Sequence, residues 1–152
     1  MCSFFVVCYY NRVEIKVKKL KTEAQLPVFA HVTDAGADLF AAEQVTISAH
    51  SRGVVSTGIA VEIPEGYAGL IWDKSGLATK NGITTIAGVI DAGYRGEIGV
   101  AISNISNEDY TFAVGDKVAQ MLFQKIEQID FSEAAILHES SRNEAGFGST
   151  GK

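Results

Sequence analysis

The strongest chemical candidate is a carboxylate in a glycine-rich turn. Asp91 lies in segment 88–96, after an apolar run and two residues before Gly93. Gly93 and Gly96 permit a tight turn that would hold the carboxylate at a rim, partly desolvated and directed at a water molecule. Asp91 is therefore a candidate general base. Considered alone, however, an aspartate that caps a turn is the commoner case, and Tyr94 alone is typical of a half-buried strand aromatic.

Three further segments place polar groups among apolar residues. Lys74, Ser75 and Gly76 offer charge, a hydroxyl and backbone N–H groups to a phosphate, or form an ordinary exposed turn. Asp38 lies in an apolar stretch, so it must be hydrogen-bonded or close to a cation, because an unpaired buried charge is costly. Gln120 lies in an apolar strand pattern, either as a satisfied core amide or as a ligand contact.

The segment 142–152 is rich in glycine and hydroxyl side chains. Its glycines allow successive backbone N–H groups to curve around an anion. Arg142 and Lys152 add positive charge, and Phe147 adds a ring that can stack on a base. This composition predicts a mobile lid for a nucleotide, with a frayed terminus as the alternative.

Composition restricts the possible partners. The chain has 152 residues, enough for one domain with its own core, and a net charge of −5 with 13 Lys and Arg against 18 Asp and Glu. Nucleic-acid binding is not expected, because it needs a concentrated basic face. Cys2 and Cys8 give neither a disulfide framework nor metal-ligand spacing, which favours a reducing, cytoplasmic location.

The first residues, 1–12, are apolar but lack the basic start and cleavage site of a signal peptide. They are also too few to span a bilayer, which needs about 20 residues. We therefore expect a non-essential extension at 1–12 and no membrane association. The domain proper is expected at 13–141, followed by the lid at 142–152.

Hydrophobic and polar residues alternate with a period of two through most of the chain, which predicts strands. Turn residues separate these runs at intervals of roughly 8–12 residues, as in β-sandwiches and β-barrels. Segment 132–139 is ambiguous between a short helix and a last strand. Strands are expected at 13–18, 45–47, 53–63, 67–72, 83–87, 97–105, 110–114 and 117–126.

Five segments, 34–40, 72–78, 88–96, 115–123 and 142–152, occur in the order of the motifs of the trimeric dUTP pyrophosphatase (dUTPase) family. The chain resembles this family from about residue 13 to residue 152. The resemblance implies an all-β, jelly-roll-like β-barrel that assembles as a homotrimer, with each active site built from three subunits. It also implies hydrolysis of dUTP to dUMP and pyrophosphate with Mg²⁺.

The resemblance assigns roles to individual residues. Asp91 would orient and deprotonate the attacking water, Tyr94 would pack on the deoxyribose and exclude a 2′-hydroxyl, and Asp38 would hold magnesium through bound water. The implied substrate contacts are Thr85, Gly88, Val89, Ile90 and Gly99 for uracil, Lys74, Ser75, Gly76 and Gln120 for the phosphates, and, from another subunit, Arg142, Phe147, Gly148 and Ser149.

The chain departs from the family pattern at several positions. Lys74 stands where arginine is usual, and a lysine ammonium is a point charge without the planar fork of a guanidinium, so phosphate positioning is expected to be looser. Asp73 adds a negative charge near the phosphate site. The segment 142–146 has fewer glycines than usual, which predicts a stiffer hinge. Gly93 replaces a second acid found in many relatives and is interpreted as a tolerated turn variant.

Two alternatives to dUTP hydrolysis are dCTP deamination and a non-catalytic role. A dCTP deaminase shares the barrel but uses a glutamate about ten residues after the aspartate. Here that position is Ala101, and no carboxylate occurs between Glu97 and Glu108. A non-catalytic nucleotide sensor or interaction module predicts loss of Asp91 or of the tail, and both are present. The sequence therefore favours the hydrolase.

Overall fold

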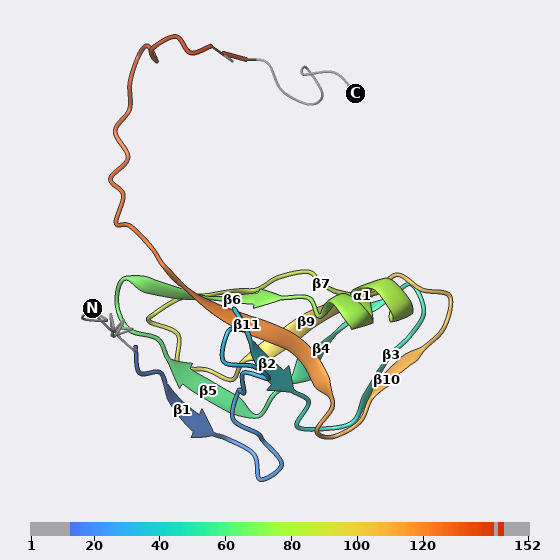
Figure 1. Cartoon of the computed structure of the whole chain (residues 1–152). Helices are drawn as coiled ribbons and strands as arrows, with labels where there is room; N and C mark the ends of the chain where they lie inside the picture. Colours follow the sequence, from blue (N-terminus) through green and yellow to red (C-terminus); the bar gives the residue numbers. More distant parts are fainter. Residues whose placement is uncertain (1–12, 142, 145–152) are drawn as a thin grey trace, which may run out of the picture.

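The computed structural model describes residues 13–141 and 143–144, and almost all of its regular structure is β (Figure 1). The strands are short, and a single helix interrupts them after β6. The elements in chain order are β1 (Lys16–Lys19), β2 (Ala37–Phe40), β3 (Val45–Ile47), β4 (Arg52–Ser56), β5 (Ile59–Glu62), β6 (Tyr67–Trp72), α1 (Ser75–Asn81), β7 (Ile83–Thr85), β8 (Val89–Ile90), β9 (Gly99–Asn104), β10 (Tyr110–Phe112) and β11 (Lys117–Lys125).

The strands pair antiparallel in four sheets. The largest has the order β2–β11–β6–β8, a second has the order β4–β9–β7, and β1–β5 and β10–β3 form two-stranded sheets. The predicted all-β class is confirmed. Within the described residues, hydrogen bonding gives these four sheets and no single closed barrel.

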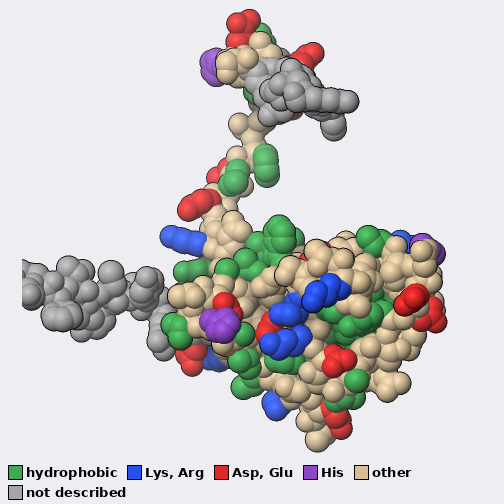
Figure 2. Space-filling view, turned by 45° about the vertical axis from the view of Figure 1, so that its right-hand side comes forward, with side chains coloured by type: hydrophobic (Ala, Val, Ile, Leu, Met, Phe, Trp, Pro, Cys, Tyr) green, Lys and Arg blue, Asp and Glu red, His purple; other side chains and the backbone are tan. Residues whose placement is uncertain are grey.

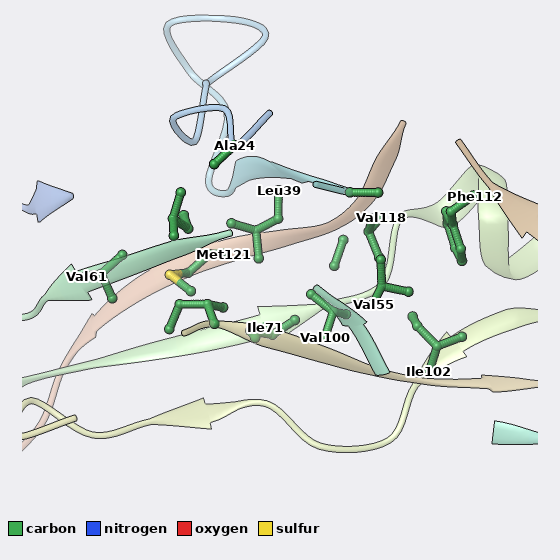
Figure 3. Close-up of a cluster of buried hydrophobic side chains, with 14 of the residues drawn as sticks. Ala24, Leu39, Val55, Val61, Ile71, Val100, Ile102, Phe112, Val118 and Met121 are labelled. Carbon is green, nitrogen blue, oxygen red and sulfur yellow. The ribbon is translucent and has the colours of Figure 1, made fainter. Parts of the chain in front are cut away.

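Strands of the four-stranded and three-stranded sheets enclose one apolar core (Figure 3). In β9 the side chains alternate, with Val100 and Ile102 fully buried and the residues between them only half-buried, as the period of two predicts. Leu39 and Met121 meet this layer from β2 and β11. The alternation of the sequence therefore fixes which face of each strand turns inward.

Several predicted boundaries change. Segment 53–63 divides into β4 and β5 at Gly58, whose φ of 66° is a left-handed conformation suited to glycine. Between the strands expected at 67–72 and 83–87 lies the unpredicted helix α1, which ends at Gly82, a left-handed C-cap with φ 65°. Segment 132–139 is neither helix nor strand. None of the described helical residues forms a helix long and apolar enough to cross a membrane.

Candidate active site

The four-stranded sheet brings together the segments singled out in the sequence. In its register, Asp38 of β2 lies opposite Gln120 of β11, and Gln120 lies opposite Trp72 of β6. On the other edge of β6, Gly69 pairs with Ile90 of β8. Asp38 and Gln120, more than 80 positions apart in the chain, thus become neighbours on adjacent strands.

Asp38 is buried and is held by two lysines. Its carboxylate forms ion pairs with Lys74 and with Lys117, the latter at 2.7 Å, and only 7% of its side chain is exposed. Burial alone would raise the pKa of Asp38, but the hydrogen bonds from Lys117 and Lys74 outweigh it and the pKa lies below its usual value. The expectation that Asp38 needs a cation is confirmed.

Lys117 was absent from the residues predicted for the site. It opens β11 immediately after the turn at Gly115, and the register places it opposite Phe40, two residues beyond Asp38. The only signal for Lys117 in the sequence was the carboxylate of Asp38 in an apolar stretch, which requires a hydrogen-bond partner or a cation. Choosing among the lysines required the strand register, which the pattern of residues does not specify.

Asp73 and Lys74 connect β6 to α1, and Ser75 and Gly76 are the first residues of the helix. Lys74 occupies the N-cap position without a side-chain cap, and Ser75 and Gly76 lie exposed in the first turn. The first N–H groups of a helix have no acceptor within the helix. A Cβ added at Gly76 would meet nothing within 4 Å, so this surface is open. The segment can therefore present backbone N–H groups and a hydroxyl to an anion.

Asp73 does not expose its charge as the sequence suggested. Its carboxylate accepts hydrogen bonds from Thr84 and from both the backbone and the side chain of Thr85. Gln120 donates from Nε2 to the Asp73 carbonyl at 2.9 Å, so this amide is satisfied within the protein. A ligand contact through Gln120 stays a prediction.

The segment 85–90, which is predicted to read uracil, lies along the edge of β6. The Ile71 N–H donates to the Gly88 carbonyl at 2.8 Å. A Cβ added at Gly88 would lie 2.7 Å from the Ile71 carbonyl oxygen, so only glycine permits this close approach. On its other side, the Ile86 N–H donates to the Ala101 carbonyl of β9. Gly99 lies two residues earlier in β9, within the neighbouring sheet.

Asp91 begins a compact, exposed turn. Its carbonyl accepts from the Tyr94 N–H at 3.0 Å, and Arg95 donates to the Ala92 carbonyl. The Tyr94 hydroxyl donates to the Glu97 carbonyl at 2.9 Å, and its ring, 45% exposed, lies directly over Gly96. The candidate base Asp91 and the candidate substrate contact Tyr94 are therefore both exposed, on a turn held by its own backbone hydrogen bonds.

The two halves of the candidate site lie at opposite ends of β6. Asp91 follows Ile90, which pairs with Gly69, whereas Lys74 follows Trp72. Gly69 and Trp72 are three residue steps apart along β6, which is roughly 10 Å at 3.3 Å per residue. One chain thus gathers Asp38, Lys74 and Gln120 but leaves Asp91 apart from them. Four predicted contacts lie outside the described residues: Arg142, Phe147, Gly148 and Ser149.

Comparison with known proteins identifies the family. The dUTPase family model matches residues 7–151. The deoxyuridine 5′-triphosphate nucleotidohydrolase of Clostridium tetani is 44% identical over 140 residues, which are 91% of this chain and 97% of that protein. The deoxyuridine 5′-triphosphate nucleotidohydrolase of Candida albicans is 43% identical over 140 residues, which are 91% of this chain and 88% of that protein. The chain belongs to the dUTPase family.

Solved structures of dUTPases resemble this chain in fold as well. A variant of the Staphylococcus bacteriophage 80alpha dUTPase with dUpNHpp superposes with a TM-score of 0.86 at 30% identity, covering 91% of this chain and 99% of that one. A variant dUTPase from phage phi11 of S. aureus, described with a structural Mg(II) ion, has a TM-score of 0.79 at 29% identity and covers 84% of this chain and all of its own. Among the described residues here, no three His, Cys, Asp or Glu side chains cluster as metal ligands.

Proposed function

We propose that this chain hydrolyses dUTP to dUMP and pyrophosphate. The observation that carries the proposal is the sheet β2–β11–β6–β8, whose neighbouring strands carry or adjoin four of the five segments that resemble the family's motifs. The relatives named for this activity cover nearly the whole chain. Neither a deaminase nor a non-catalytic sensor has support among the matched relatives.

Asp91 acts as the general base. Its exposed position on a turn fixed by backbone hydrogen bonds leaves the carboxylate accessible to water. It removes a proton from the water that attacks the α-phosphorus, and pyrophosphate leaves. Tyr94, anchored through its hydroxyl to the Glu97 carbonyl, presents its ring to the deoxyribose and leaves no space for a 2′-hydroxyl.

Segment 85–90 reads the base with backbone groups. The chain is held there by Ile71 on one side and Ala101 on the other, so its remaining N–H and C=O groups have fixed directions. Thr85, Gly88, Val89 and Ile90 contribute to this wall, with Gly99 lining the same pocket from β9. Backbone groups in fixed directions distinguish uracil from cytosine by donor and acceptor pattern.

Lys74, Ser75, Gly76 and Gln120 hold the phosphates, and Asp38 meets Mg²⁺ through bound water. Magnesium in nucleotide sites keeps several waters and takes few protein ligands, because phosphates supply the rest. The single ionised carboxylate of Asp38 fits such an outer contact. The metal supplies charge neutralisation on the phosphates. When phosphates arrive, Lys74 has an alternative anionic partner to Asp38.

The active form is a homotrimer with shared sites. Asp91 and Lys74 lie at opposite ends of β6, so one site takes them from two subunits. After β11 the chain leaves the body (Figures 1 and 2) with apolar side chains in solvent: Phe131 is 95% exposed and Ile136 87%. A groove of about 370 Å³ beside β1 is lined by apolar residues including Ile15 and Phe29. Such surfaces are typical of subunit contacts.

The tail completes the site from a further subunit. Arg142 is expected at the terminal phosphate, Phe147 on the uracil, and Gly148 and Ser149 over the triphosphate, as the family resemblance implies. Removing residues 142–152 should cripple catalysis while folding and assembly persist, because closure adds donors at the developing charge and excludes water. The reaction is expected in the cytoplasm.

A substrate panel tests the proposed activity directly. Purified protein with Mg²⁺ is supplied with dUTP, UTP, dTTP or dCTP, and pyrophosphate release and base deamination are scored separately. Selective pyrophosphate release from dUTP is expected, because Tyr94 excludes the 2′-hydroxyl of UTP and the base-reading segment has no room for the 5-methyl of dTTP. Comparable kcat/KM values for UTP and dUTP would refute the proposal.

A further inference from the structure

The Asp73 side chain joins the end of β6 to the end of β7. Its Oδ1 accepts from the Thr85 backbone N–H at 2.6 Å and from the Thr85 hydroxyl at 2.7 Å, and its Oδ2 accepts from the Thr84 hydroxyl at 2.8 Å. Burial would raise the pKa of this half-buried carboxyl, but the hydrogen bonds from Thr85 and Thr84 outweigh burial and lower it. Asp73 is therefore ionised at neutral pH.

The backbone of the same residue is fixed from the opposite side. The Gln120 amide of β11 donates to the Asp73 carbonyl at 2.9 Å. One residue later, the Lys74 carbonyl accepts from the Ala78 N–H, so α1 begins at once, and α1 packs beside β7. Lys74 is consequently held between Asp73, which is hydrogen-bonded to β7 and β11, and α1, whose first residues are Ser75 and Gly76.

We propose that Asp73 is a positioning residue for the reaction: its carboxylate clamps Thr84 and Thr85 and so holds residues 74–76 where they meet the triphosphate. It acts through this segment and makes no contact with substrate. The inference rests on the proposed function, because it presumes that residues 74–76 bind phosphates.

The pairing of charges separates this role from simple repulsion of the substrate. Lys74 directs its ammonium to Asp38, whereas the charge of Asp73 is stabilised by N–H and O–H donors. A carboxylate that accepts several hydrogen bonds has its charge stabilised locally. The Asp73 carboxylate is thus hydrogen-bonded to β7, although the residue directly precedes Lys74, the lysine proposed to bind phosphate.

Two substitutions of Asp73 distinguish geometry from charge. Asp73→Ala removes all three acceptor contacts. Asp73→Asn removes the charge but keeps the shape: Oδ1 still accepts from Thr85, and Nδ2 can donate to the Thr84 hydroxyl, which is also an acceptor. The positioning role therefore predicts rescue by asparagine. Thr84→Val, which removes one contact and keeps the β-branched shape, provides a milder test in case the alanine variant does not fold.

Binding of dUpNHpp and of dUMP is measured by calorimetry, with the emission of Trp72, the single tryptophan of the chain, as a local reporter. Asp73→Ala should weaken dUpNHpp binding about tenfold or more, the loss expected for hydrogen bonds to a charged group. Binding of dUMP, which lacks the β- and γ-phosphates, should change less than about threefold, and so should dUpNHpp binding to Asp73→Asn. Thr84→Val should lose about threefold for dUpNHpp. KM should rise more than kcat falls.

Asp109→Ala is the matched control, since the Asp109 carboxylate also accepts from a backbone N–H, that of Ala49 at 2.8 Å, in a turn before β10. It should lower stability without changing the ratio of the two affinities. Tighter dUpNHpp binding by both Asp73 variants would show charge repulsion and overturn the proposal. Equal losses for the two ligands, or no loss in Thr84→Val, would also overturn it. A wild-type protein inactive on dUTP would instead refute the proposed function.

Discussion

The two ends of β6 are built differently. At the Trp72 end, the carboxylates of Asp38 and Asp73 both have partners within the subunit. Asp38 forms ion pairs with two lysines, and Asp73 accepts hydrogen bonds from two threonines. At the Gly69 end, the turn that carries Asp91 and Tyr94 is held by its own backbone, and both side chains face solvent.

This difference separates binding from chemistry. A site for phosphates benefits from groups whose positions are set before the ligand arrives, because less reorganisation is then needed. A general base must remain accessible to the water that it deprotonates. The two lysines that pair with Asp38 belong to the other end of β6. The structure of one subunit thus favours a site completed by another.

The largest effect is expected at the exposed end. Asp91→Asn keeps the shape but cannot accept a proton, so kcat should fall by at least about 100-fold. Binding of dUpNHpp should stay within about threefold, because the amide keeps the shape of the carboxylate. Steady-state kinetics and calorimetry check both parts. A variant that retained most of its kcat would identify another residue as the base.

Gly88→Ala should damage the exposed end through its support on β6. The new Cβ would lie 2.7 Å from the Ile71 carbonyl oxygen, so β8 must move away from β6. Overpacking of this kind costs about 1–3 kcal/mol of unfolding free energy, and kcat/KM should fall about tenfold. Gly93→Ala is the stability control, since nothing lies within 4 Å of its added Cβ. Equal unfolding free energies for the two variants would contradict the close approach.

Asp38→Asn should lower the unfolding free energy in a pH-dependent way, because it removes the ion pairs of Asp38 with Lys74 and Lys117. The pKa of Asp38 is lowered from 3.8, so its contribution is complete well above that value and is lost as the pH falls through the folded pKa. Unfolding free energy at pH 7 should drop by about 1–2 kcal/mol, less than for a fully buried pair because the lysines are partly exposed. Urea titrations should show a flatter acid limb in the variant. Parallel acid limbs would contradict the pairing.

Tyr94→Phe should have the smallest effect. It removes only the hydrogen bond from the hydroxyl to the Glu97 carbonyl, at a cost of about 1 kcal/mol or less for an exposed group. The ring that excludes the 2′-hydroxyl remains, so discrimination between dUTP and UTP should persist while kcat falls a few-fold. Measuring kcat/KM for both nucleotides tests this. Loss of discrimination would assign specificity to the hydroxyl.

Local patterns predicted the strands well because alternation of polar and apolar residues is a local property. The bounds of β3 and β6 match the expected 45–47 and 67–72. α1 was missed because its seven residues carry no buried side chain and hence no helical stripe. Its signal was Gly82, which reads equally as a turn or as a helix C-cap.

The sequence predicted candidate residues for the site but not the pairings among them. The apolar surroundings of Asp38 predicted a hydrogen-bond partner or a nearby cation. That this cation includes Lys117 follows only from the register of β2 with β11. The charge of Asp73 was expected near the phosphates, whereas Thr84 and Thr85, eleven and twelve residues away, bind it. Contacts across strands depend on topology, which side-chain types alone do not encode.

Complementation between two inactive variants tests the shared site most directly. Asp91→Asn and Lys74→Met subunits are refolded together at equal concentration and assayed on dUTP, with each variant alone as control. If every site takes Asp91 from one subunit of a closed trimer and Lys74 from the next, about a quarter of the sites in random mixtures are intact. The account predicts activity near a quarter of the wild-type value. A mixture as inactive as its parents would contradict it.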